Sequence, residues 1–355
     1  MGDGTAGRPA SIARMLAIDG WTHPIALSPM AGAGTAALAA AVTEAGGLGA
    51  ISVGALDAMR ARAAIAEVRE RTRGAFNVNV FCHQPARSQP AVEAAWLAHL
   101  RPAFAQFGAA PPPLLREIYR SFLVDDALLA VLVETRPRVV SCHFGLPSPD
   151  AVRALRGAGT RLFATVTSVA EAHTAIAAGI DVLVAQGYEA GGHRGVFDER
   201  APDAQLGTLA LVRELAAAVR APVLAAGGIM TGAEIRAAIE AGAIGAQLGT
   251  AFLACPESGI EDAHRHLLGR ASETVMTRAM SGRPARLIAN RLTAIEDGVP
   301  PAYPIAYDAA KALHAVARAH GEHGYGPQLA GTGAPRARAM PAAALVATLV
   351  RELAA

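Results

Sequence analysis

The residues with the clearest capacity for chemistry lie in one glycine-rich segment. Between Gln186 and Gly195 the sequence reads Gln-Gly-Tyr-Glu-Ala-Gly-Gly-His-Arg-Gly, so that four glycines surround His193. Glycines at this density do not stabilise a helix or a strand, but they allow the backbone to lie against a flat or anionic ligand. A histidine beside such a ligand can transfer a proton or stabilise a developing anion near neutral pH. A solvated surface histidine is the alternative, and the glycine density and the preceding apolar run favour the functional interpretation.

Two further glycine-containing segments predict a phosphate site. Ala226-Gly-Gly-Ile229 and Gln247-Leu-Gly-Thr250 each follow or end a short apolar run. Gly227 and Gly228 permit close approach of an anion to backbone N–H groups, and Thr250 can add a hydroxyl. Tight turns would explain the glycines of either segment alone, whereas the two segments together favour phosphate binding.

Other patterns in the sequence are less informative. Gly32-Ala-Gly-Thr-Ala-Ala37 matches the loose dinucleotide fingerprint Gly-x-Gly-x-x-Ala, but the following apolar run does not end in the acidic residue that such a nucleotide site requires. His264 and His266 lie among charged residues and predict a solvated helix face rather than a metal site. The three cysteines are far apart and form no Cys-x-x-Cys pair, so neither zinc nor a disulfide framework is indicated. No metal site is therefore expected.

These segments need a scaffold that brings the ends of separate strands together. Apolar runs without polar alternation, typical of strands covered on both faces, occur at residues 24–30, 48–54, 75–81, 139–145, 161–167, 181–187, 221–228 and 243–250. Helical patterns separate most of them, at 35–45, 57–71, 149–157, 168–179, 207–220 and 231–242. Eight such units in succession predict an α/β fold, a closed (β/α)8 TIM barrel of parallel strands. The loops after the strands of such a barrel form one face, where the segments above would meet.

Two stretches interrupt the strand–helix rhythm. Residues 82–137 follow the third strand and are interpreted as an inserted cap subdomain, and residues 261–355 as a C-terminal helical and cap extension. The barrel is then expected over residues 24–260, after an N-terminal arm at residues 1–23. Within the extension, the glycine-, alanine- and proline-rich segment 331–338 predicts a mobile loop.

The composition excludes several classes of protein. Of the 355 residues, 52% are hydrophobic and 17% charged, which predicts a large buried core rather than disorder. The net charge of +2 is too small to indicate nucleic acid or an anionic membrane as a partner. The polar N-terminus lacks a signal peptide, and no apolar run is long enough to span a membrane. A cytoplasmic protein is expected, with a homodimer as one option for its oligomeric state.

Taken together, the motifs resemble those of the nitronate monooxygenases, formerly called 2-nitropropane dioxygenases. The resemblance runs from about Pro24 to Leu329 and rests on Pro29-Met-Ala-Gly32, Gly46-Gly-Leu-Gly49, Phe76-Asn-Val-Asn79, Ala190-Gly-Gly-His-Arg-Gly195, Ala225-Ala-Gly-Gly-Ile229 and Gln247-Leu-Gly-Thr-Ala-Phe252. Tyr303-Pro-Ile-Ala-Tyr307, followed by the only lysine of the chain, Lys311, resembles the substrate segment of the bacterial class I.

The resemblance implies an FMN-dependent oxidoreductase that uses O2 to convert a small alkyl nitronate, such as propionate 3-nitronate, to an aldehyde with nitrite or nitrate. His193 would be catalytic, either as a base toward a neutral nitroalkane or as a positioning group for a preformed nitronate. Tyr303, Tyr307 and Lys311 would bind the substrate, with packing in a cap segment as their alternative role. The implied cofactor-binding residues are Pro29, Met30, Asn79, Gln186, Gly191, Gly227, Gly228, Gln247, Leu248, Gly249 and Thr250.

Departures from the family pattern lie in the expected cap. Leu329-Ala-Gly-Thr332 stands where the bacterial class often has Trp-Ala-Gly-Gln, and the expected aromatic residue of the insertion is Phe104 or Phe107 rather than tyrosine. These changes leave two other functions open: an NAD(P)H-dependent flavin reductase acting on a quinone or an enoyl thioester, and a non-catalytic flavin-binding protein. The segment from Tyr303 to Lys311 favours the oxygenase.

Overall fold

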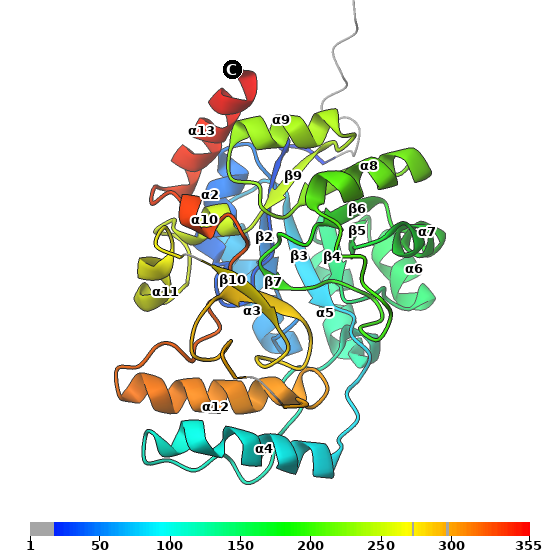
Figure 1. Cartoon of the computed structure of the whole chain (residues 1–355). Coiled ribbons are helices and arrows are strands. Elements are labelled where there is room, and N and C mark those ends of the chain that lie inside the picture. The colour runs from blue at the N-terminus through cyan, green and yellow to red at the C-terminus, as the bar shows by residue number, and fades with distance from the viewer. Residues whose placement is uncertain (1–17, 272, 296–297) are drawn as a thin grey trace, which may run out of the picture.

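Eight parallel strands form a closed barrel, as predicted (Figure 1). The computed structural model describes residues 18–271, 273–295 and 298–355, so most of the predicted N-terminal arm, residues 1–17, lies outside the described part. The strand order is β1-β9-β8-β6-β5-β4-β3-β2. The ring closes between its two ends, where Ala26 bridges Leu48 and the backbone N–H of Leu27 donates to the carbonyl of Leu48 at 2.8 Å.

Every barrel strand lies inside one of the predicted apolar runs. The strands are β1 (Ile25–Leu27), β2 (Gly49–Ser52), β3 (Phe76–Phe81), β4 (Val139–His143), β5 (Arg161–Val166), β6 (Val182–Gln186), β8 (Val223–Ala226) and β9 (Gly245–Leu248). Six helices fall within the predicted helical ranges: α2 (Ala36–Glu44), α3 (Ala58–Arg71), α6 (Pro149–Gly157), α7 (Val169–Ala177), α8 (Thr208–Ala218) and α9 (Gly232–Glu240). The last predicted strand was expected to extend to Thr250, but β9 ends at Leu248 and Thr250 begins the short helix α10 (Thr250–Leu253).

Local capping explains where several of these helices begin. The side chains of Asp57, Ser148 and Ser168 each accept a hydrogen bond from the backbone N–H three residues further on. At α9, Thr231 and Glu234 form a reciprocal capping box. Because these caps fix the first turn of each helix, they also fix the length of the loop between strand and helix, which is the loop that forms the functional face.

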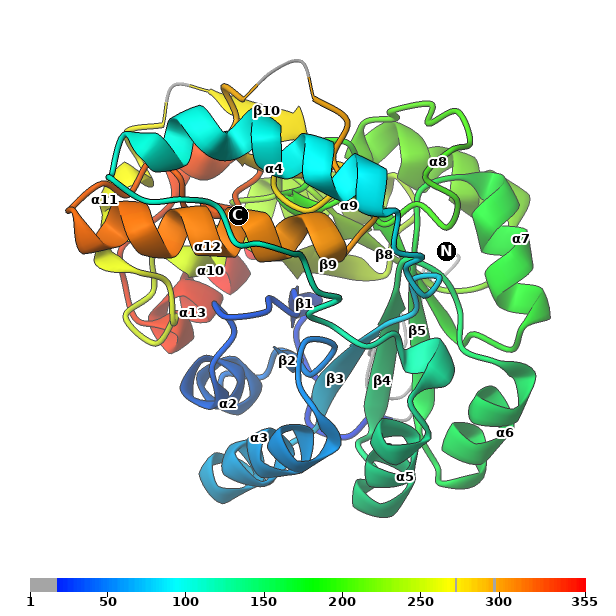
Figure 2. The ribbon, with the colours of Figure 1, turned by 90° about the horizontal axis from the view of Figure 1, so that it is seen from below.

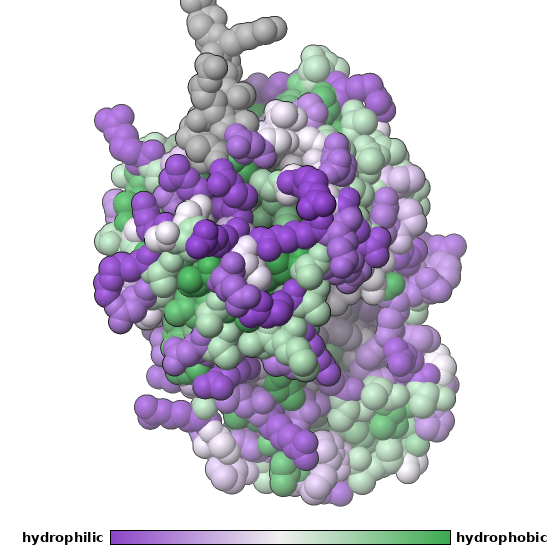
Figure 3. Space-filling model, turned by 180° about the vertical axis from the view of Figure 1, so that it is seen from behind, coloured by the Kyte–Doolittle hydropathy of each residue, from purple (hydrophilic) through white to green (hydrophobic). Residues whose placement is uncertain are grey.

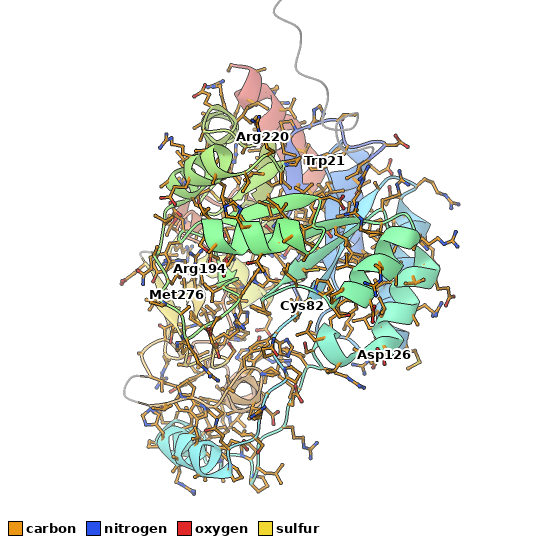
Figure 4. The ribbon with its side chains drawn as sticks, turned by 90° about the vertical axis from the view of Figure 1, so that its right-hand side faces the viewer. Trp21, Cys82, Asp126, Arg194, Arg220 and Met276 are labelled. Carbon is orange, nitrogen blue, oxygen red and sulfur yellow. The ribbon has the colours of Figure 1, made fainter. Side chains whose placement is uncertain are left out.

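The barrel interior changes from apolar to polar along its axis. Large apolar side chains fill the amino end, among them Trp21, Phe163 and Val182. Inward-facing positions near the carboxyl ends carry Asn79, Ser141, His143, Thr165 and Gln186, which are linked by hydrogen bonds described below. Trp21 lies toward one end of the barrel, and Cys82, directly after β3, toward the other end and the cap (Figure 4). Polar chemistry is thus confined to one end.

Two helices that are far apart in sequence form a cap below the carboxyl ends of the strands. α4 (Pro90–Ala105) from the insertion and α12 (Ile305–Ala319) from the C-terminal part lie side by side in both ribbon views (Figures 1 and 2). Trp96, Leu100 and Phe104 of α4 share an apolar cluster with Ile305 and Leu313 of α12. We therefore interpret the insertion and the extension as parts of one cap.

The same two stretches also contribute helices to the barrel. α5 (Asp126–Thr135), preceded by the 3-10 turn η1 (Phe122–Val124), packs against α3 and α6 between β3 and β4. The C-terminal helix α13 (Ala342–Ala354) packs against α9 and α2 and so closes the helical ring (Figure 1). The chain returns to the barrel after each excursion into the cap.

A second, antiparallel sheet was not predicted. It consists of β10 (Thr274–Thr277), β11 (Ala285–Ile288) and β7 (Gly192–His193), in the order β10-β11-β7. β10 and β11 follow the short helix α11 (Asp262–Leu267) in the chain, whereas β7 precedes it. Its third strand has two residues and lies within the glycine-rich segment, so only pairing with β11 identifies it as a strand.

The segment predicted to be a mobile loop is anchored at several points. Gly331 donates its N–H to the hydroxyl of Thr250 at 2.9 Å, and Thr332 donates to the carbonyl of Glu189 at 3.0 Å. The turn η2 (Ala334–Arg336) follows, and Arg338 pairs with Glu352 of α13 at 2.6 Å. These contacts hold the segment against the barrel, so the predicted mobility is not what its packing indicates.

Polar and apolar residues are interspersed over the face of the molecule opposite to that of Figure 1 (Figure 3). Within the described part of the chain, no helix combines the length and apolar character needed to cross a membrane.

Candidate active site

The small sheet places His193 at the carboxyl ends of the barrel strands. His193 pairs with Ala285 of β11, and the N–H of Arg194 donates to the carbonyl of Pro284 at 2.8 Å. Gly192 has a φ of 79°, a conformation that favours glycine, and this turn brings the chain onto β11. The glycine-rich segment is therefore a defined loop that crosses from the barrel to the small sheet.

Two inward-facing side chains hold the backbone of His193. Gln186 Nε2 and His143 Nε2 both donate to the His193 carbonyl, at 2.9 and 3.2 Å. Gln186 Oε1 accepts the N–H of Gly195 at 2.7 Å, and the Thr165 hydroxyl lies 3.0 Å from His143 Nδ1. Since His143 Nε2 carries the proton, Nδ1 accepts from Thr165. Both atoms of the Gln186 amide are thus engaged in positioning the loop.

Buried arginines fix the remainder of the loop. Arg194, 2% exposed, donates to both carboxylate oxygens of Asp203 at 2.8 and 2.9 Å and to the Gln186 carbonyl. The hydrogen bonds from Arg194 lower the pKa of Asp203. Arg286 donates twice to the Tyr188 carbonyl, at 3.0 and 2.8 Å, and its guanidinium lies 4.9 Å from the Tyr188 ring centre. The loop therefore presents His193 from a rigid support.

Ser281 is a contact of the His193 ring that the sequence did not indicate. Its hydroxyl lies 2.8 Å from His193 Nε2, and the Ser281 side chain is fully buried. The other acceptor within reach of this hydroxyl, the Arg283 carbonyl, is 3.4 Å away. The shorter bond is the stronger one, which favours donation by Ser281 to Nε2 and a proton on Nδ1. A serine 88 residues further along the chain offers no local signal.

The environment of His193 keeps its ring neutral. Burial lowers its pKa to about 3, and the proximity of His143, Arg283 and His83 acts in the same direction. The residue as a whole retains some accessible surface, and burial is still the largest cause of the lowered pKa. His143 is affected in the same way, and its pKa falls to about 4, mainly by burial.

Two of the predicted substrate residues lie beside His193. The ring centre of His193 is 5.3 Å from that of Tyr303 and 6.4 Å from that of Tyr307. The ammonium of Lys311 lies 5.0 Å from the centre of the Tyr307 ring. Tyr303 is buried, Tyr307 half-buried and Lys311 exposed, so these residues lead from the depth of the site to its opening.

Tyr119 completes this aromatic group and was missed from the sequence. Its ring centre lies 5.8 Å from that of Tyr307 and 4.8 Å from the Lys311 ammonium. Phe104 and Phe107, the residues expected here, instead pack in the cap, Phe107 against Tyr325. Tyr119 is the only tyrosine between residues 82 and 137, which was the available signal.

All three tyrosines keep their hydroxyl protons in this environment. Burial raises the pKa of Tyr307 to about 12 and raises the pKa values of Tyr303 and Tyr119 as well. Burial also lowers the pKa of the Lys311 ammonium. The hydroxyls can therefore donate hydrogen bonds to an anion.

The predicted phosphate loops come together next to the glycine-rich segment that carries His193. Gly227 and Gly228 have φ values of 126° and 70°, so their backbone makes a turn that side chains disfavour. A Cβ on Gly228 would lie 3.4 Å from the Thr332 hydroxyl, and one on Gly249 would lie 3.5 Å from Met30 Sδ. The segment 330–332 thus lies against the loop after β8 and, through Thr250, the loop after β9, a contribution that the sequence did not predict.

The chemistry of these loops fits a phosphate group such as that of FMN. Gly228 and Gly249 are half-buried, and within the described part of the chain no protein acceptor takes their backbone N–H groups. Arg336 donates to the Gly228 carbonyl at 2.9 Å, and its guanidinium is also paired with the carboxylate of Glu234. The neighbouring carboxylate of Glu189 is taken up by the N–H and hydroxyl of Thr208 at the start of α8. Free N–H donors around glycines are what a phosphate requires.

The other predicted cofactor residues differ in how they face the site. Pro29 and Met30 are half-buried in the loop after β1. Asn79 donates to the Ser141 hydroxyl and carbonyl at 2.9 and 3.1 Å. The Gln247 amide has no protein partner among the described residues, whereas the Leu248 side chain is buried in the layer between strands and helices. Leu248 can therefore face a cofactor through its backbone alone.

The expectation of a solvated face for His264 and His266 is half correct. His266 is exposed, but His264 is buried, and burial lowers its pKa to about 4. Within the described residues, no group of His, Cys, Asp and Glu side chains could hold a metal ion.

His83 gives the site a measurable pH dependence of stability. It is 1% exposed, neither ring nitrogen makes a hydrogen bond of ordinary geometry with a described residue, and burial followed by the charge of Arg283 lowers its pKa to about 4. In the unfolded chain a histidine titrates near about 6.5, so between these values the unfolded state binds the extra proton and stability falls as the pH falls. We expect His83 to lower the free energy of unfolding by about 2 kcal/mol between pH 6.5 and 5. Urea unfolding of wild type and His83→Gln at both pH values measures this, and an equal pH slope in both would contradict it.

The chain is similar to proteins of one family over nearly its whole length. The nitronate monooxygenase family profile matches residues 13–352. The sequence is 54% identical over 345 residues to a nitronate monooxygenase of Paraburkholderia phytofirmans, which covers 96% of this chain and 94% of that protein. It is 53% identical over 340 residues to one of Pseudomonas aeruginosa, which covers 94% and 97%.

Solved structures with the same barrel are also similar. Nitroalkane oxidase from Streptomyces ansochromogenes has a TM-score of 0.88 and 40% sequence identity, and the match covers 95% of this chain and 97% of that one. FabK from Thermotoga maritima has a TM-score of 0.72 and 29% identity, with coverage of 97% and 95%.

Proposed function

The chain belongs to the nitronate monooxygenase family and is an enzyme that oxidises nitronates, and from this premise we propose that it binds FMN non-covalently and uses O2 as its oxidant. Its substrates are small alkyl nitronates such as propionate 3-nitronate, and its products are an aldehyde and nitrite or nitrate. The observation that carries this proposal is the convergence of His193, three tyrosines and Lys311 beside loops with free N–H donors.

The residues that would hold the cofactor divide into two groups. Gly228, Gly249 and Thr250 would bind the phosphate, supported by Arg336. Asn79 and Gln247 supply amides near the strand ends, suited to the donor and acceptor edge of a flavin. Gln186 and Gly191 act mainly by positioning their loop. When bound, the flavin supplies the redox centre that takes electrons from the substrate and passes them to O2.

His193 is suited to hold a preformed nitronate rather than to create one. A group with a pKa of about 3 is a weak base, and a weak base removes a carbon-bound proton slowly. With Ser281 donating to Nε2, the proton on Nδ1 is available to an anionic oxygen. His193 therefore acts as a neutral hydrogen-bond donor to the substrate.

The tyrosines and Lys311 are suited to bind and orient an anion. The Tyr303 and Tyr307 hydroxyls stay protonated and can donate to a nitronate or carboxylate oxygen. Lys311 at the opening adds a point charge that attracts the carboxylate of a substrate such as propionate 3-nitronate.

Oxygen consumption by the purified flavin-loaded protein tests the function. We expect aerobic turnover of propionate 3-nitronate without added NAD(P)H. The competing function, an NAD(P)H-dependent flavin reductase, predicts rapid anaerobic bleaching of the flavin by micromolar NADH, and that result would overturn the proposal. A flavin spectrum without turnover of any nitronate would indicate a non-catalytic flavin-binding protein instead.

Lys311→Met should weaken capture of substrates that carry a second negative charge. We expect the KM for propionate 3-nitronate to rise about tenfold and its dependence on ionic strength to become shallower, because a charge at the rim acts mainly on encounter. Lys311→Arg keeps the charge and should stay close to wild type. Equal KM changes for propionate 3-nitronate and for ethyl nitronate, which lacks the carboxylate, would show that Lys311 does not bind the carboxylate.

A further inference from the structure

Phe144 stands at the centre of the site in a conformation that is costly for its residue type. Its φ is 72°, in the left-handed region that bulky side chains rarely adopt, and the residue is 2% exposed. Its ring centre lies 4.4 Å from that of His143, 5.6 Å from His193 and 5.2 Å from Tyr303. The strained backbone therefore places one aromatic ring against the groups that surround the substrate.

A buried arginine lies over this ring. The guanidinium carbon of Arg283 is 4.4 Å from the centre of Phe144, and Arg283 is 4% exposed. Gly282, with a φ of 89°, makes the turn before Arg283, and a Cβ on Gly282 would lie 2.2 Å from the Pro301 carbonyl oxygen. The turn thus places Ser281 against His193 and Arg283 against Phe144 from the same short segment.

Among the described residues, the charge of Arg283 has one distant partner of opposite sign. Oε2 of Glu199 is 3.9 Å from Nε, and Arg278 shares this carboxylate at 3.5 Å. Nε makes no hydrogen bond within the described part of the chain, and Nη2 donates to the Val196 carbonyl. A buried charge that is poorly paired is costly, and an anion brought into the site would reduce that cost.

The effect of Arg283 extends to the groups around the substrate. Its positive charge lowers the pKa values of His83, His143 and His193, in each case after the larger effect of burial. The three rings are neutral as a result, so they add no positive charge to that of Arg283. The site therefore combines neutral hydrogen-bonding groups with one buried cation behind Phe144.

We propose that Arg283, acting through the ring of Phe144, is a positioning residue that makes the site select anionic nitronates over neutral nitroalkanes. This inference rests on the proposed function and adds the residue that sets its preference for charge. The guanidinium does so without touching the substrate, because its field crosses an aromatic ring and a water-poor interior, where charge interactions are stronger than in water.

Two variants of opposite effect test the inference. Arg283→Met keeps an unbranched apolar stem but removes the charge, and we expect KM for ethyl nitronate to rise about tenfold with kcat within about threefold of wild type. The KM for neutral nitroethane should not change. Glu199→Gln removes the carboxylate that partly neutralises Arg283, and we expect this variant to lower the KM for ethyl nitronate about twofold. Arg283→Lys retains a charge and should restore most of the wild-type preference.

Nitrate, a planar oxyanion that does not react, provides a readout apart from turnover. Titration of the flavin absorption spectrum with nitrate should give a dissociation constant about tenfold higher in Arg283→Met and lower in Glu199→Gln. In ¹⁵N-histidine NMR, the titration midpoints of the buried rings should rise in Arg283→Met. If Arg283→Met does not fold, Glu199→Gln alone decides the question.

Failure of this inference differs from failure of the proposed function. Wild-type protein that oxidises ethyl nitronate, together with variants whose KM ratio and nitrate affinity are unchanged, would overturn the role of Arg283 and leave the function intact. Absence of nitronate turnover in wild type would overturn the function, whereas the nitrate and NMR measurements would still report on the charge of Arg283.

Discussion

Replacement of Gly191 by alanine should release the flavin. A Cβ at this position would lie 2.3 Å from the N of Gly331 and 2.4 Å from the carbonyl carbon of Ala330. Both are backbone atoms, so the loop that carries His193 and the segment 330–332 must move apart. The proposed phosphate loops then lose their contact with the segment 330–332. Overpacking of this kind costs about 1–3 kcal/mol, which corresponds to an FMN dissociation constant roughly five- to 150-fold higher. The ratio of flavin to protein absorbance after desalting measures the loss.

Gly157→Ala is the matched control for this substitution. Gly157 ends α6 on the barrel exterior, has no positive φ, and a Cβ there would meet nothing within 4 Å. This variant should keep the flavin and should not be less stable than wild type, because alanine is the better helix former. Retention of a full complement of FMN by Gly191→Ala would show that the contact between the two loops does not matter for cofactor binding.

His193→Leu, which removes the ring and its N–H donor, should lower kcat/KM for propionate 3-nitronate about a hundredfold while the flavin stays bound. Removal of one hydrogen-bond donor to a developing or resident anion costs about this much in other enzymes. The histidine carbonyl, not its ring, receives the bonds from Gln186 and His143, so the loop keeps its support in the variant. Steady-state oxygen consumption, normalised to bound flavin, measures the effect.

His173 is an exposed histidine on α7, and His173→Leu is the control that should turn over as wild type. If His193 is a hydrogen-bond donor with a pKa of about 3, the wild-type kcat/KM for nitronate should also show no loss assignable to His193 between pH 6 and 8. Unchanged turnover in His193→Leu would remove His193 from catalysis. A hundredfold loss with neutral nitroethane but none with the nitronate would assign it the role of base instead.

Much of the barrel could be predicted because its elements are set by local sequence. Buried parallel strands appear as uninterrupted apolar runs, and caps such as Ser148 and Thr231 mark the helix starts. Regular succession of these units implies closure, and closure places the loops after β6, β8 and β9 on one face. The glycine loops and His193 could therefore be assigned to a common site before any contact was known.

The missed residues share a different property. Ser281 contacts a ring 88 residues away, and Tyr119 reaches the site from an insertion without a recognisable pattern. The segment 331–338 has the composition of a mobile loop, yet backbone and side-chain bonds to Thr250 and Glu189 hold it in place. These contacts come from packing between distant segments, which local composition does not encode.

The glycine-rich segment from Gln186 to Gly195 shows where the division lies. The sequence by itself determined that a flexible backbone with one histidine follows a buried strand, because glycine and histidine carry those properties at any position. Only the tertiary structure decided that Gln186 supports the loop, that Ser281 orients the ring, and that burial beside Arg283 keeps His193 neutral. The protonation state of a side chain depends on the charges and solvent around it, and these are supplied by the whole fold.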